Sequence, residues 1–224
     1  MSTRVLVVAS LLLASLASGL ALRMGDYGTA PWMLSRGSGL VAFGLLSLSM
    51  VMGLLISTKA ADGTLSRPFV FTIHQFVSVL SLAFMAVHGG ALLFDGFLRF
   101  GPLALLVPFA APYRPFWVGL GVIAAWSAAA VTASFWFRKR IGQRNWRRLH
   151  YASFGAYVLA LGHGVFSGTD TSLPLVAGMY VISFAAVAGL LTYRIGVASR
   201  KARPAPAGAA RRSGMTSAAR PRSR

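Results

Sequence analysis

Two pairs of histidines are the residues of this chain whose type and spacing point most directly to chemistry. His74 and His88 lie 14 residues apart in one apolar segment, and His150 and His163 lie 13 apart in another. Ionisable side chains within membrane-length apolar segments are costly and rare, so each is a functional candidate. Neutral imidazole is a good axial ligand for haem iron. If the two segments pack side by side in the same direction, each histidine of one lies level with a histidine of the other, as two bis-histidine haem sites require.

The spacings set the geometry that the two segments must have. A separation of 14 residues is about 21 Å of rise and nearly four turns, which places His74 and His88 on one helix face. The other separation is about 3.6 turns and would point its two rings apart, so we expect a kink or bulge there, with Gly155, Gly162 and Gly164 as candidate positions. Two other interpretations are hydrogen-bonding core histidines and zinc. Zinc is disfavoured because the two members of a pair are about 20 Å apart along the helix and no acid or cysteine completes a site.

The composition indicates the class of protein that positions these residues. Hydrophobic residues make up 56% of the chain and charged residues 12%, and a soluble domain carries about twice that charged fraction. The formal net charge of +18 comes from basic residues between apolar runs and in the C-terminal tail, so we expect no nucleic-acid partner. With four acids, no glutamate and no cysteine, the chain has little from which to build a carboxylate pair, a disulfide, a thiolate nucleophile or an iron–sulfur site.

Six apolar runs have about the 20-residue length that crosses a bilayer. They are Val5–Leu22, Ser38–Ser57, Val70–Phe94, Pro115–Phe137, Leu149–Phe166 and Leu173–Ile195. The first run is alternatively a signal peptide. The connection Gly101–Pro112 is too short to span and is expected to lie along the outer interface. We therefore predict an all-α integral membrane protein, a six-transmembrane-helix bundle over residues 1–199, followed by a basic disordered cytoplasmic tail over residues 200–224.

Lysine and arginine predict the orientation of the bundle, because they stay on the cytoplasmic side of short loops. With the N-terminus inside, 18 of these residues lie on the inner side and 4 on the outer side. We expect a multi-pass protein of the plasma or inner membrane, in contact with lipid and with both termini cytoplasmic. His74 and His150 then lie near the cytoplasmic face, and His88 and His163 near the outer face.

Several motifs resemble those of the ferric reductase-like transmembrane domain, which ferric reductases, NADPH oxidases and the haem-binding subunit of the periplasmic methionine-sulfoxide reductase share. They are the two histidine spacings, the "SRGSG" that opens the second span, the Thr132–Ser134 end of the fourth span, and the basic loop "RKRIGQRNWRRLH". The resemblance covers about Ser35 to Ile195. It implies a bundle that holds two stacked haems b.

The resemblance also implies residue roles. His74 and His150 correspond to ligands of the inner haem iron, and His88 and His163 to ligands of the outer haem iron. Arg36 corresponds to an arginine near the outer haem propionates, although a role as a cap at the membrane interface is equally open. Arg147 and Arg148 either serve the inner propionates or hold their loop on the cytoplasmic side.

These observations predict a b-type cytochrome that carries electrons across the membrane through two bis-histidine haems. The donor is a cytoplasmic protein or a quinol, and the acceptor is extracytoplasmic, with a periplasmic protein as one candidate. The chain is expected to be an oxidoreductase component; its one glycine-rich match, Gly119–Ala124, lies inside a span and is no dinucleotide turn. The alternatives are a single-haem subunit of a periplasmic reductase, a branch of the family that lacks an equivalent of His74, and a cofactor-free transporter or membrane anchor.

Overall fold

The computed structural model describes residues 29–60 and 62–202, and every regular element within them is a helix. The helices are α2 (Ala30–Thr58), α3 (Arg67–Leu92), α4 (Pro102–Leu106), α5 (Pro115–Ile141), α6 (Gln143–His150), α7 (Ala152–Ser167) and α8 (Pro174–Ala202). Four of them, α2, α3, α5 and α8, are long and apolar enough to cross a membrane. The prediction of an all-α, multi-pass membrane protein is confirmed at this level.

The six predicted spans correspond only in part to these helices. The second, third, fourth and sixth spans are α2, α3, α5 and α8. The fifth is α7, whose 16 residues are fewer than the roughly 20 that a span needs. The first span, Val5–Leu22, lies outside the described residues, as does most of the predicted tail, although α8 continues to Ala202. The count of six therefore stays a prediction.

The basic segment expected to be a loop is helical instead. Helix α5 runs on through Arg138, Lys139 and Arg140 to Ile141, and α6 begins directly after Gly142. Arginine, lysine and glutamine are good helix formers, so this basic segment favours helix over loop. Gly142 breaks the helix because its φ of 80° suits glycine. The segment is thus a corner at which the chain turns from α5 into α6 at Gly142.

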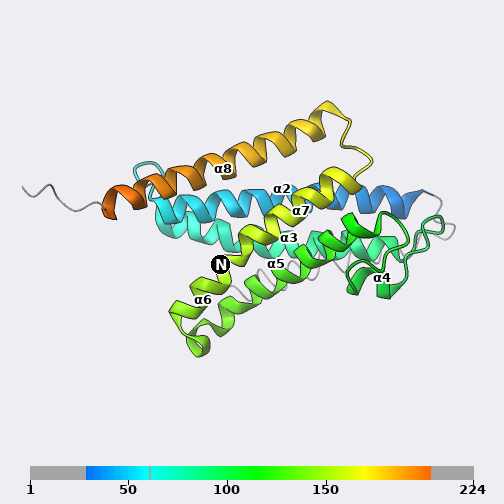
Figure 1. Ribbon diagram of the computed structural model, residues 1–224, viewed down its shortest axis with the longest axis horizontal. Coiled ribbons are helices and arrows are strands. Elements are labelled where there is room, and N and C mark those ends of the chain that lie inside the picture. Colours follow the sequence, from blue (N-terminus) through cyan, green and yellow to red (C-terminus); the bar gives the residue numbers. More distant parts are fainter. Residues whose placement is uncertain (1–28, 61, 203–224) are drawn as a thin grey trace, which may run out of the picture.

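The long helices lie along the long axis of the molecule, with α6 at one end and α4 at the other (Figure 1). Helix α2 packs most extensively on α3, and α5 packs most extensively on α7, while α8 covers α2. The two pairs meet mainly where α2 contacts α7, and α3 makes little contact with α5 or α7. Helices α3 and α7 are therefore not packed directly against each other.

The core that holds the bundle together is centred on α2. Phe43 of α2 stacks on Tyr157 of α7, with ring centres 6.0 Å apart, and both side chains are buried. A chain of hydroxyl groups runs beside them: Tyr157 and Ser183 are 2.7 Å apart, and Ser183 Oγ donates to Ser47 Oγ at 2.8 Å. Hydrogen bonds of this kind link helices within a bilayer. They join α7, α8 and α2.

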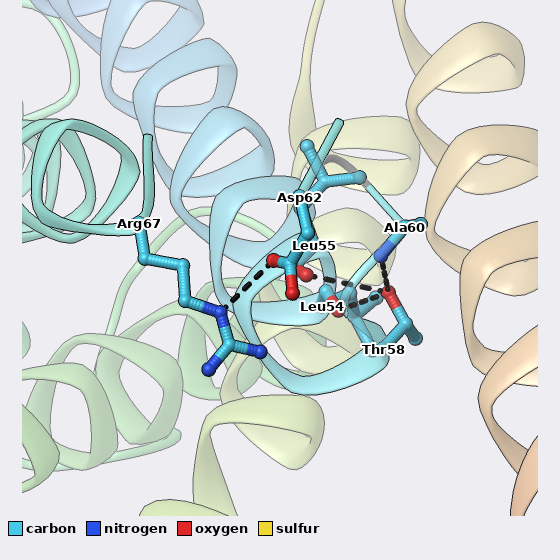
Figure 2. Close-up of polar contacts among 6 residues, drawn as sticks. All are labelled: Leu54, Leu55, Thr58, Ala60, Asp62 and Arg67. Atoms are coloured by element: carbon cyan, nitrogen blue, oxygen red, sulfur yellow. Dashed lines mark hydrogen bonds and ion pairs between the residues drawn. The ribbon is translucent and has the colours of Figure 1, made fainter. Parts of the chain in front are cut away.

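The turn after α2 is stabilised by its own polar groups (Figure 2). Thr58 Oγ1 donates to the Leu54 carbonyl at 2.9 Å and accepts the N–H of Ala60 at 3.3 Å. Across the turn, Arg67 Nε donates to Asp62 Oδ1 at 2.9 Å. These contacts support the antiparallel return of α3 along α2, on which the register of the histidines depends.

The connection between α3 and α5 packs against the helices at one end of the bundle. Phe100, Ala104 and Ala111 pack with Leu92 in a second, smaller core. Trp126 Nε1 donates to the Leu106 carbonyl at 3.0 Å. Trp126 lies eleven residues into α5, about 16 Å along that helix. The connection therefore runs down the side of α5.

Candidate functional site: two cavities with paired histidines

The structure brings the four histidines together as two pairs, in the combinations that helical spacing predicted. The ring centres of His74 and His150 are 6.1 Å apart, and those of His88 and His163 are 5.9 Å apart. The first pair lines a cavity of about 370 Å³, here the first cavity, and the second pair lines a cavity of about 250 Å³, the second cavity. Leu46 lines both, so the two cavities are neighbours along the bundle.

The 13-residue spacing is accommodated by a break at Tyr151. His150 is the last residue of α6, whereas His163 belongs to α7. The N–H of Tyr151 donates to the carbonyls of both Arg147, at 3.3 Å, and Arg148, at 3.2 Å, which tightens the turn. The expectation of a kink at one of the three later glycines was therefore wrong. Because the two rings lie on two separate short helices, each can face its partner on α3, His74 or His88.

Three of the histidines have their Nδ1 atoms hydrogen-bonded to backbone carbonyls of a neighbouring helix. The bonds join His74 to Ser49 at 3.0 Å, His88 to Ser35 at 2.8 Å, and His163 to Trp117 at 3.0 Å. A carbonyl only accepts, so each Nδ1 carries the proton and each Nε2 keeps a free lone pair. No Nε2 atom of the four has a hydrogen-bond partner among the described residues. Metal-ligating histidines have this arrangement.

A glycine admits each of these three rings to the backbone of the facing helix. Gly39, Gly53 and Gly121 each lie four residues after the accepting carbonyl, hence beside it on the same helix face. A Cβ at Gly121 would lie 2.6 Å from His163 Nδ1, and one at Gly39 would lie 2.7 Å from His88 Nδ1. At Gly53 the nearest histidine atom would be 3.4 Å away. Glycine allows the close approach that these hydrogen bonds require.

The anchoring residues of α2 form a repeat that sequence reasoning missed. Ser35 and Gly39 recur as Ser49 and Gly53, 14 residues later, which equals the spacing of the two histidines on the antiparallel helix α3. Both serine hydroxyls also approach their histidine Nδ1 at 3.2 Å. The motif "SRGSG" contains only the first copy. The signal that would have found the second is the equality of the two spacings.

The pairs fit a haem iron held between them. With a metal–nitrogen bond of about 2 Å on each side, two imidazoles on opposite sides of one iron have ring centres about 6 Å apart. The observed separations are 6.1 and 5.9 Å. A porphyrin would supply the remaining ligands. By contrast, the described residues contain no group of three or more His, Cys, Asp or Glu side chains that would hold a bare metal ion.

Arg36 lines the second cavity, but its guanidinium is engaged by Asp170. Arg36 Nε donates to Asp170 Oδ2 at 2.8 Å, and Arg36 Nη2 donates to Asp170 Oδ1. Such bidentate pairs are strong and geometrically specific. Asp170, in the α7–α8 connection, also lines this cavity and was not singled out from the sequence, although it is one of only four acids. The role of Arg36 towards propionates stays a prediction.

The first cavity has its own set of hydrogen-bond donors. Arg147 lines it, together with Arg194 from α8, whereas Arg148 is not among its lining residues. Arg194 Nη2 donates to the Tyr151 hydroxyl at 3.3 Å. Trp146 Nε1, also at this cavity, is buried and has no partner among the described residues. These groups could donate hydrogen bonds to a carboxylate of a bound ligand. Arg194 could be identified as one of these donors only from the fold, which brings α8 to this cavity.

The fold and the two cavities define a helical, multi-pass membrane protein with paired histidines at two levels of its bundle. Comparisons of the chain with protein-family models, with curated proteins and with solved structures found no match. The resemblance to the ferric reductase-like domain therefore rests on the sequence motifs.

Proposed function

We propose that this chain is a b-type cytochrome that carries electrons across the membrane through two bis-histidine haems. The observation that carries the proposal is the double pairing, His74 with His150 and His88 with His163, at separations of 6.1 and 5.9 Å. Each pair lines its own cavity and presents free Nε2 atoms. Fourteen residues of α3, about 21 Å of rise, separate the two levels. That distance covers much of the hydrocarbon core of a bilayer.

Each group of residues has a defined task in this proposal. A bound haem supplies the one-electron chemistry. The histidines hold the iron, and the carbonyl bonds at Nδ1 fix the tautomer and raise the basicity of the ligand. The apolar linings, including Leu46 between the cavities, exclude water. Arg36 at the second cavity, and Arg147 and Arg194 at the first, provide partners for the propionates.

The charge distribution supports the orientation of the chain, and with it the side of the membrane on which each site lies. The first cavity lies at the α6 end of the bundle, beside the basic corner Arg138–Arg148, which the positive-inside rule assigns to the cytoplasm. A cytoplasmic protein or a quinol thus donates to the first site, and an extracytoplasmic acceptor takes electrons from the second. This makes the chain the membrane component of an oxidoreductase.

The equal geometry of the two pairs favours two haems over one. The His74–His150 pair has almost the separation of the other pair, so it qualifies as a site by the same criterion. A proton-conducting transporter would use carboxylates beside the histidines. No Asp or Glu is found among the described residues that line the first cavity, and the carboxylate at the second cavity, Asp170, is paired with Arg36.

The decisive experiment is a haem measurement on protein purified from cells grown with haem available. The proposal expects a reduced b-type absorbance band and two haems per chain by pyridine extraction. His88→Ala should remove one haem, while Thr132→Ala, a change in the first-cavity lining, should keep both. A colourless protein refutes the proposal. One haem that His74→Ala leaves untouched indicates the single-haem alternative.

A further inference from the structure

His150 is the exception among the four histidines. Its Nδ1 atom is buried and has no hydrogen-bond partner among the described residues. The other three Nδ1 atoms each bond to a carbonyl at 2.8 to 3.0 Å. Such bonds orient a ligating ring and strengthen it as an electron-pair donor. His150 lacks this support, whereas its partner His74 has it.

The sequence of α5 explains the difference. Gly121 admits His163 to α5, and the position 14 residues further along the same face is Phe135. The carbonyl that would correspond to that of Trp117 belongs to Val131, about one turn before Phe135. A benzyl group thus stands where the other three sites have a glycine, and it blocks the approach of the His150 ring to that carbonyl.

His150 rests on an aromatic ring instead of on a helix backbone. Phe135 packs on Trp146 with ring centres 6.5 Å apart, and Trp146 stacks on His150 at 5.1 Å and 30°. Stacking restrains the plane of the imidazole but leaves its rotation about the stack free. A ring held in this way can swing out of line more easily than one tied to a carbonyl.

The helix that carries His150 is also weakly held. Helix α6 contains no buried residue and contacts mainly α5, with the break at Tyr151 separating it from α7. Segments with few buried contacts open locally at low free-energy cost. His74, in contrast, lies within α3, which packs along the length of α2.

We propose that His150 is a displaceable ligand and that the first cavity therefore binds a small diatomic molecule at the position His150 leaves. This rests on the proposed haem function. With haem bound, the exchange would be a ligand substitution without redox change: His150 would leave the iron, His74 would keep holding it, and the neutral diatomic molecule would take the place of His150. His88 and His163 both keep their carbonyl anchors, so the second cavity takes no such ligand.

Carbon monoxide titration of the reduced, haem-loaded protein tests the proposal. About half of the haem should bind carbon monoxide, namely that of the first cavity. Loss of an outer hydrogen bond to a ligating side chain typically costs about 10–100-fold in metal affinity or activity. Phe135→Gly, which opens the route to the α5 backbone, should accordingly weaken carbon monoxide binding by about tenfold or more. Phe137→Gly is the matched control, because it makes the same change on α5 at a side chain that is 52% exposed and does not line the cavity.

Haem content gives a second readout that does not depend on Phe135→Gly folding well. His150→Ala should retain both haems, the first now with a high-spin spectrum, whereas His74→Ala should lose one. His88→Ala and His163→Ala should lose the second haem alike. Protein with two haems that binds no carbon monoxide, and that loses the same haem with either His74→Ala or His150→Ala, overturns this inference alone. Protein without any haem overturns the proposed function and this inference with it.

Discussion

Gly121→Ala tests the anchoring of the histidines most directly. The new Cβ would lie 2.6 Å from His163 Nδ1, and ordinary contact begins at 3.4 Å, so the ring must retreat by about 0.8 Å. The bond from Nδ1 to the Trp117 carbonyl, now 3.0 Å, would then lengthen to about 3.8 Å and cease to be a hydrogen bond. A ligand that loses such support binds its metal about 10–100-fold more weakly, which is about 1.4–2.7 kcal/mol.

The helix itself does not oppose this substitution. Alanine is favoured over glycine inside a helix by about 1 kcal/mol, so any loss of haem reflects the displaced histidine and not a broken α5. We expect Gly121→Ala to lose haem from the second cavity in a competition with apomyoglobin, while the far-UV circular dichroism stays unchanged. The first-cavity haem should be retained.

Two other glycines complete the series. Gly44→Ala is the matched control, because nothing lies within 4 Å of its Cβ position, and it should keep both haems. Gly53→Ala should have a small effect, since its Cβ would meet His74 at 3.4 Å. If Gly121→Ala binds both haems as tightly as Gly44→Ala, the reasoning that the glycine admits the histidine is refuted.

Three further predictions concern the bundle as a whole. Asp170→Asn should lower the free energy of unfolding in detergent by about 1–3 kcal/mol, because it breaks a bidentate, partly buried ion pair. Asp62→Asn, in an exposed pair, should have a smaller effect, and equal thermal shifts for the two would contradict this. Trp126→Phe should leave the Leu106 carbonyl without its donor and raise protease cleavage of the α3–α5 connection, and unchanged cleavage would argue against that contact. In this cysteine-free chain, Asn145→Cys should react with an impermeant maleimide only from the cytoplasmic side; labelling from outside reverses the proposed orientation.

Local features of the chain were readable from the sequence alone. The lengths of the apolar runs predicted α2, α3, α5 and α8, because burying backbone groups in a bilayer demands a helix of that length. The 14-residue spacing placed His74 and His88 on one face, because 3.6 residues make a turn. The length of α7 and the helical corner before it were not predicted, since both depend on where Gly142 and Tyr151 interrupt an otherwise continuous helical pattern.

The sequence by itself thus determined the class of protein and the levels at which the histidines lie, both of which follow from composition and helix periodicity. Only the tertiary structure decided which carbonyl each imidazole reaches, that Arg36 pairs with Asp170, and that His150 reaches no carbonyl at all. The reason is that these contacts depend on the register and distance between helices. Those are set by side chains far apart in the chain, such as a glycine on one helix opposite a histidine on another, and no spacing within a single helix encodes them.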